Sequence, residues 1–493
     1  MNLKSAKPAS RETINNLMQN SANMISSLYA GISEEVAALR TLEASGDSQL
    51  LIYAHQLHIA VSYSLIDLGV SVRASLGADK PLEKRFHLKN LMASISESFK
   101  VIMNFDKARK KSLWTKLSGE LHNVENPTFL ALYDDITKKL EAFGSSYIDQ
   151  DLRNLTLHYD DNMMRVYEAT VGINDEDKTL KVFIEYIDIL QLILVFSDLL
   201  VSSDRPCTEQ TGNAIQVEID SIINGYFRQA LDNNGRLKEV LDKVIDGEGR
   251  GIDLIADNIR RFARLEVWMK ENGMPFMPEL ESVKILMNAE LLIGFMMGDL
   301  ASVTMAYLRS ESEVESKMNL RRYVVIKTST LVHLYGYNQG EKDNSVWRLL
   351  MSCIPEDETA LLDEATMLEK QLKKLITSSD KQERALYVHL VNNSNSKFAV
   401  PVTLSAIDAI GPIVKIAQTQ EVLYVAKNVR ILLRKIMDVL SKRAKEANKQ
   451  STQKLEASFS EIIGMLNKSK LPQETKAQLR ESFEKLRNTV ADI

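Results

Sequence analysis

Apolar residues recur at helical spacing along almost the whole chain. In residues 11–43 they fall three, four or seven positions apart, at Ile14, Leu17, Met24, Leu28, Ile32, Val36 and Leu39. This spacing places the apolar side chains on one face of an α-helix. The same pattern, interrupted at Gly and Pro, predicts further helices in the first half of the chain over residues 49–76, 82–104, 127–143, 148–169 and 178–201.

The helical pattern continues after Pro206. It predicts helices over residues 208–245, 252–271, an apolar segment ending at Leu308, 314–336, 357–378, 380–394 and a long stretch from Pro401 to about 447. The glycine-rich segment GEGRG, residues 247–251, is expected to be a flexible connection, because glycine disfavours helix interiors. Residues 452–491 indicate a small amphipathic helical hairpin with its turn at Leu471-Pro472.

Composition agrees with an all-α fold. Aromatic residues make up only 6% of the chain, and residues that favour helix dominate instead. A chain of 493 residues is too long for one ordinary core. We therefore expect two helical bundles followed by a hairpin, with domains over residues 1–205, 206–450 and 451–493.

The two bundles show weak similarity to each other. The segment KRFHLKNLMASIS from Lys84 aligns with RRYVVIKTSTLVH from Arg321, and LWTKL at Leu113 aligns with VWRLL at Val346. We interpret residues 46–202 and 279–447 as two copies of one unit, related by internal duplication. The alternative is that any two helical bundles share this degree of pattern.

Charge and cysteine content favour a cytoplasmic protein. The net charge is −5, so no global field attracts nucleic acid, and any polyanion site must be a local patch. Cys207 and Cys353 are too few for a disulfide framework. We find no segment of signal-peptide type and no uncharged apolar run long enough to span a membrane, since Glu290 and Asp299 interrupt the best candidate. We expect no membrane association.

Two short motifs carry the candidate chemistry. Arg153 and His158 lie five positions apart with Asn154 after the arginine, and Arg384 and His389 repeat that spacing. With 7 His in the chain, about a third of one such pair is expected by chance. Two pairs occur, and they occupy matching places in the two proposed copies.

This arrangement resembles the HEPN superfamily, whose helical bundles carry an arginine and a histidine four to six residues apart, often with Asn after the arginine. The resemblance implies a metal-independent RNA endonuclease whose composite site forms where two motifs face each other. It also implies a possible toxin or defence role, with an antitoxin or other protein partner. Ala385 stands where the second motif would have its Asn. A second reading is therefore a non-catalytic helical scaffold or a nucleotide- or protein-binding module.

The residue types suit RNA cleavage without a metal. A histidine can act as base toward the 2′-hydroxyl or as acid toward the leaving oxygen, because its pKa lies near neutrality. An arginine offers a fork of donors to the phosphate. Residues five apart lie about 140° around an ideal helix, so Arg153 must reach round to share a site with His158. Asn154 and His158, four apart, share a face.

Other candidates have equally plain structural readings. Arg260, Arg261 and Arg264 form a local basic patch that would bind RNA phosphates, or else a solvated helix face. His55 and His58 have metal-ligand spacing, but the sequence offers no third ligand, which favours a structural role. We expect no metal or other cofactor. The oligomeric state is open between a monomeric pseudo-dimer and a homodimer.

Overall fold

The computed structural model describes most of the chain as α-helix. The described residues are 11–46, 48–103, 112–122, 126–148, 163–173, 176–202, 236–271, 277–376, 416, 418–468 and 480–481. No β-strand occurs among them. The all-α prediction is confirmed.

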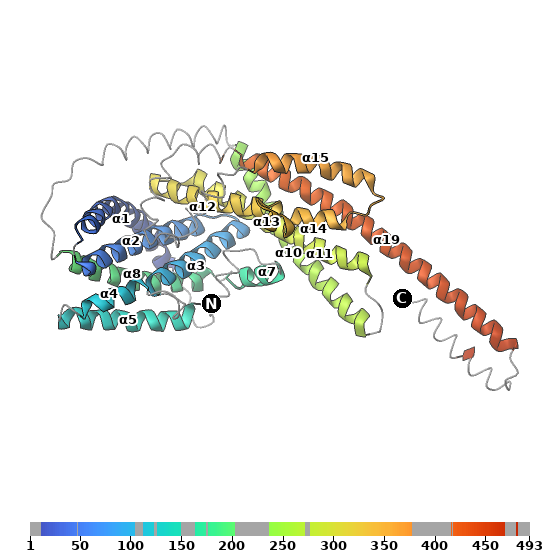
Figure 1. Cartoon of the computed structure of the whole chain (residues 1–493), viewed down its shortest axis with the longest axis horizontal. Coiled ribbons are helices and arrows are strands. Elements are labelled where there is room, and N and C mark those ends of the chain that lie inside the picture. The colour runs from blue at the N-terminus through green and yellow to red at the C-terminus, as the bar shows by residue number, and fades with distance from the viewer. Residues whose placement is uncertain are drawn as a thin grey trace.

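The first half of the chain forms one helical bundle (Figure 1). Its helices are α1 Arg11–Ser45, α2 Gln49–Leu76, α3 Pro81–Met103, α4 Leu113–Leu121, α5 Pro127–Tyr147, α7 Met163–Gly172 and α8 Glu176–Ser202. The apolar helix α2 is central and packs against α1, α3, α4 and α8. Trp114 and Phe196 lie in its core, almost fully buried.

The second half forms another bundle beside the first (Figure 1). Its helices are α10 Arg236–Glu271, α11 Pro278–Arg309, α12 Glu313–Leu334, α13 Gln339–Asp343, α14 Val346–Cys353, α15 Thr359–Leu375 and α19 Thr419–Lys468. Here α11 is the central helix and packs against α10, α12, α14 and α19. The methionines at 296, 297 and 305 fill its core, as apolar residues of irregular shape do.

Side-chain caps set several helix starts. Ser112 and Ser345 each accept a hydrogen bond from a backbone N–H of the first turn, three residues on, at the start of α4 and α14. Asn126 does the same for α5, with Pro127 in the first turn. Ser312 forms a capping box with Glu315 at the start of α12. These contacts satisfy backbone donors that a helix leaves free, and so they fix where each helix begins.

The predicted break at GEGRG is wrong, because α10 runs through residues 247–251 without interruption. Leu241, Ile245 and Ile252 keep the helical spacing across the glycines, and all three are buried. Glu248, inside the segment, accepts two hydrogen bonds from Arg430 of α19 at 2.8 and 2.7 Å. Tertiary packing therefore outweighs the low helix propensity of three glycines.

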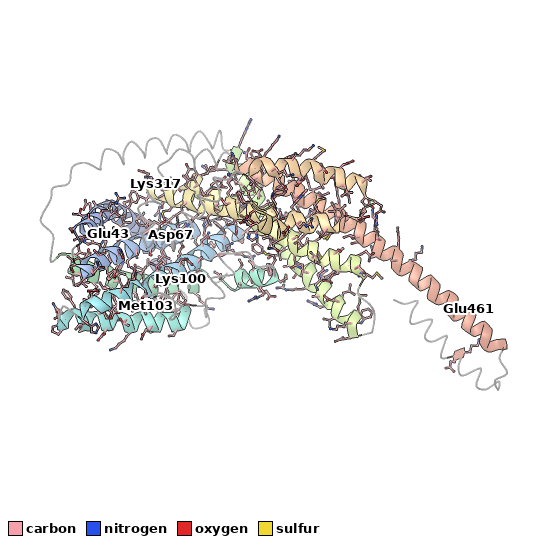
Figure 2. The ribbon with its side chains drawn as sticks, in the orientation of Figure 1. Glu43, Asp67, Lys100, Met103, Lys317 and Glu461 are labelled. Carbon is pink, nitrogen blue, oxygen red and sulfur yellow. The ribbon has the colours of Figure 1, made fainter. Side chains whose placement is uncertain are left out.

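The long helix α19 also differs from expectation. It continues to Lys468 with no break near residue 451, where the C-terminal hairpin was predicted to begin. The predicted turn at Leu471-Pro472 lies outside the described residues. The distal part of α19 projects from the second bundle, and Glu461 lies far along it (Figures 1 and 2).

Helices of the two halves begin at corresponding positions. Glu313 of α12 lies 232 positions after Pro81 of α3, and Thr359 of α15 lies 232 positions after Pro127 of α5. The capping residues Ser112 and Ser345 are 233 apart. A register of 232 taken from these helix starts would pair Lys84 with residue 316, whereas the sequence alignment pairs it with Arg321, five residues further on.

Two helices, α2 and α11, are long and apolar enough to cross a membrane. In α2, 78% of the apolar window is buried inside the fold, and in α11 94% is buried. Burial of this kind is typical of the core helix of a bundle.

Candidate functional site

All five residues of the two motifs lie outside the described residues. These are Arg153, Asn154, His158, Arg384 and His389. The structure does describe what precedes and follows the first motif. Helix α5 ends at Tyr147, and α7 begins at Met163, directly after the motif.

Helix α7 joins the two halves. Met163 is 2% exposed, and both it and Val166 belong to the core of the second bundle although they come from the first half of the chain. Tyr167 donates a hydrogen bond to Asp253 of α10 at 3.0 Å. Met163, the first described residue after His158, therefore lies at the junction between the bundles.

The predicted RNA-binding arginines have different surroundings. Arg260 lies over the ring of Tyr167 at 5.3 Å and pairs with Asp257 at 3.2 Å and, more loosely, with Glu168 at 3.9 Å. Arg261 and Arg264 are exposed. The guanidinium of Arg260, which was predicted to bind an RNA phosphate, thus contacts two carboxylates of the chain itself. RNA binding by the three arginines stays a prediction.

The junction itself contains a cluster of buried charges from α2, α3, α11 and α12. Its centre is Asp67 of α2, which accepts hydrogen bonds from Arg322 at 2.7 Å and from Ser94 at 2.6 Å. Arg321 lies 3.5 Å from the same carboxylate. Burial alone would raise the pKa of Asp67, but Arg322 and Arg321 hold it below its ordinary value, so the carboxylate is charged. Figure 2 shows Asp67 and Lys317 where α12 lies over α1 and α2.

Three further ion pairs link the halves in the same region. Lys89 of α3 pairs with Asp299 of α11, and both side chains are 6% exposed. Arg309 of α11 pairs with Glu83 of α3 at 2.9 Å. Arg73 of α2 pairs with the carboxylate of Glu315, the capping residue of α12.

One buried pair of titratable groups lies beside these bridges. Burial raises the pKa of Glu83 to about 7, against the opposing effect of Arg309. Burial, together with Arg322 and Arg309, lowers the pKa of His87 to about 3, so this imidazole is neutral near pH 7. Neither ring nitrogen of His87 has a hydrogen-bond partner within the described ranges. Both groups stand among core residues, and a structural role explains them.

His55 and His58, the two histidines with metal-ligand spacing, have different carboxylate partners. His55 contacts Glu35 of α1 at 2.6 Å, whereas His58 contacts Asp198 of α8 at 3.1 Å. The two side chains therefore hold α2 to two different neighbours. In the part of the chain that the structure describes, no three His, Cys, Asp or Glu side chains gather as a metal site would require.

Sequence reasoning missed the buried charged junction. Asp67 and Asp299 each interrupt a strongly apolar helix, within LIDLGV and MMGDLA. A lone carboxylate in such a run must find a cation when it is buried, so these two residues were the available signal. Their partners are too distant in sequence for periodicity to identify them.

Comparison with known proteins assigns no family to the chain. No protein-family model matches it. No curated protein and no solved structure matches it either.

Proposed function

We propose that the protein is a metal-independent RNA endonuclease of the HEPN type. Its site would be composed of Arg153 and His158 from one half and Arg384 and His389 from the other. Two features support this. The two histidines are 231 positions apart, close to the 232 that separates the helix starts of the two halves. The observation that carries the proposal is the burial of Met163 in the core of the opposite half, directly after the first motif.

The proposed reaction needs two proton transfers. One histidine removes the proton of a 2′-hydroxyl, whose oxygen attacks the adjacent phosphorus. The 5′-oxygen of the next nucleotide leaves and takes a proton from the other histidine, which gives a 2′,3′-cyclic phosphate and a 5′-hydroxyl. The arginines would stabilise the charge that develops on the phosphate oxygens. Because Ala385 replaces the asparagine, we assign the stronger acid–base role to His158.

The test is RNA cleavage in the presence of EDTA. The wild-type chain should cleave single-stranded RNA and leave cyclic phosphate ends. His158→Ala should lose at least about a hundredfold in rate, which is the usual contribution of a general acid or base. His122→Ala is the matched control, because His122 is exposed at the end of α4 and bonds only to the carbonyl of Ser118 among the contacts described.

Two outcomes would reject the ribonuclease. One is the absence of cleavage by pure, folded protein across several RNA types. The other is equal cleavage by wild type and His158→Ala, which would indicate a contaminant. If the activity holds, growth arrest on expression that His158→Ala relieves would extend the proposal to a toxin or defence effector.

A protein-binding scaffold is the second candidate, and one specific feature favours it. The buried residues of α1 have buried counterparts in α10 that lie 220 positions later in the chain, as Ile245 does after Ile25. Corresponding residues of the later helices are instead 232 positions apart. The second half therefore has 12 more residues between the matching positions of its first two helices, half of them in the C-terminal part of α10. The α10 side of this longer connection carries Val267 and Trp268, which are 56% and 44% exposed. An apolar surface that no core requires is typical of an interaction site.

A further inference from the structure

The two halves exchange apolar residues at their junction. Leu82 and Phe86 come from α3 in the first half, but they belong to the core of the second bundle. Val314 and Met318 come from α12 in the second half, but they pack with α1 and α2 of the first bundle. Each residue of the second pair lies 232 positions after its counterpart in the first. Corresponding residues of α3 and α12 are thus each inserted into the core of the opposite half.

The fold makes room for this insertion. A Cβ at Gly298 of α11 would lie 2.8 Å from the Cδ2 atom of Leu82, and one at Gly249 of α10 would lie 3.5 Å from its Cβ atom. Leu82 is 4% exposed and Met318 is fully buried. The contact between halves is therefore packed as closely as a core.

Charges are exchanged in the same way. Lys89 of α3 pairs with Asp299 of α11, and Arg321 of α12 lies 3.5 Å from Asp67 of α2. Asp299 is 232 positions after Asp67, and Arg321 is 232 positions after Lys89. The two cations therefore occupy corresponding positions in α3 and α12, and the two anions occupy corresponding positions in α2 and α11. In one pair the cation comes from the first half, and in the other it comes from the second half.

A second reciprocal pair lies at the ends of these helices. Glu83 and Glu315, again 232 apart, are both in the first turn of their helices. Glu83 pairs with Arg309 in the last turn of α11, and Glu315 pairs with Arg73 in the last turn of α2. The glutamates match the register of 232, whereas Arg309 lies 236 positions after Arg73, one helical turn away from exact correspondence. Only 26% of the residues are charged, so the matching signs at Asp67 and Asp299 and at Lys89 and Arg321 are not expected of two unrelated bundles.

We infer that the junction is a self-complementary surface: the face formed by the second and third helices of each half binds a copy of itself. A surface on which residue i contacts residue j while j contacts i is the isologous contact of a twofold dimer. The second half of the chain supplies the partner that a second subunit would supply in a homodimer. The chain is thus a fused pair of one ancestral unit, and this does not depend on the ribonuclease activity.

The test uses charge reversals in the full chain, read by thermal unfolding and by amide hydrogen exchange of α3 and α12. Glu83→Arg and Glu315→Arg should each speed exchange of both helices about tenfold or more, because each places two cations side by side at the closely packed junction. The matched doubles Glu83→Arg with Arg309→Glu, and Glu315→Arg with Arg73→Glu, restore opposite charges across each bridge. Each should recover at least half of the loss.

The control has the same composition as the matched doubles. Glu83→Arg with Arg73→Glu makes one Glu-to-Arg and one Arg-to-Glu change, but it places like charges across both bridges. It should recover nothing and should be worse than either single reversal. Equal recovery by the control, or recovery at only one of the two reciprocal bridges, would overturn the self-complementary surface. Cleavage of RNA is not read in this experiment, so its result is separate from that of the proposed nuclease.

Discussion

At the scale of single residues, the junction holds two groups whose ionisation opposes folding. Glu83 is 1% exposed, and among the described residues Arg309 lowers its pKa whereas burial, Asp79 and Asp242 raise it. His87 lies one turn along α3 with its Nε2 atom 4.0 Å from the Glu83 carboxylate. Because the pKa of His87 is lowered to about 3, acid does not readily charge this imidazole to form an ion pair. His87 is therefore neutral near pH 7, whereas Glu83 loses its proton around that pH and then pairs with Arg309 as a carboxylate.

Glu83→Gln should change how stability depends on pH. The pKa of Glu83 in the folded protein, about 7, lies above its ordinary value of 4.5. The stability due to its bound proton is thus present below pH 4.5 and is lost as the pH rises through 7. Between pH 5 and pH 8 the free energy of unfolding of wild type should fall relative to Glu83→Gln, by at most about 3 kcal/mol. Thermal or urea unfolding at both pH values measures this.

Glu356→Gln is the control for this prediction, because Glu356 is an exposed carboxylate in a turn. Its difference from wild type should hardly change with pH. A Glu83→Gln difference that stays constant from pH 5 to pH 8 would contradict the raised pKa of Glu83.

At the scale of helices, contacts between helices determine where a helix continues or ends when the local helix propensity does not. The starts of seven of the 14 described helices were predicted within a few residues, because the apolar spacing is a local signal. They are the starts of α1, α2, α3, α5, α8, α12 and α15. The helix break predicted at GEGRG does not occur. The low helix propensity of glycine favours a break there, whereas the burial of Ile245 and Ile252 and the Glu248–Arg430 bridge favour a continuous helix. Contacts of α10 with α11, α3 and α19 show that the second effect dominates.

Gly144→Ala tests such a contact between helices. A Cβ at Gly144 of α5 would lie 2.6 Å from the ring of Phe99 in α3. That ring is held by Phe143 and Tyr186, with centroids 6.2 and 6.5 Å away, so it cannot easily move. We expect a loss of about 1–3 kcal/mol in the free energy of unfolding. Gly119→Ala in α4 meets open space and should instead gain up to about 1 kcal/mol. Equal effects at the two sites, measured by thermal unfolding, would contradict the close packing.

At the scale of the whole molecule, the sequence predicted two helical bundles but not how they meet. The Arg-x4-His motifs drew attention because they are short and local. The junction is assembled from pairs such as Asp67 and Arg322, which are 255 residues apart, and no pattern of spacing within one helix reveals it. The helix starts and caps favour a spacing of 232 between α3 and α12, whereas the alignment of the two segments used 237, because sequence identity is low there.

The insertion of α3 and α12 into opposite bundles has a consequence for cooperativity. Neither bundle retains its complete core if the other melts, since Leu82 and Phe86 would withdraw from one and Val314 and Met318 from the other. Calorimetry of the full chain should therefore give one heat-absorption peak for both bundles, although two separate peaks are common for tandem domains of this size. Two resolved peaks in wild type would show that the bundles unfold independently. A destabilising substitution near the start of α3 should therefore loosen the core of the second bundle, although α3 comes from the first half of the chain.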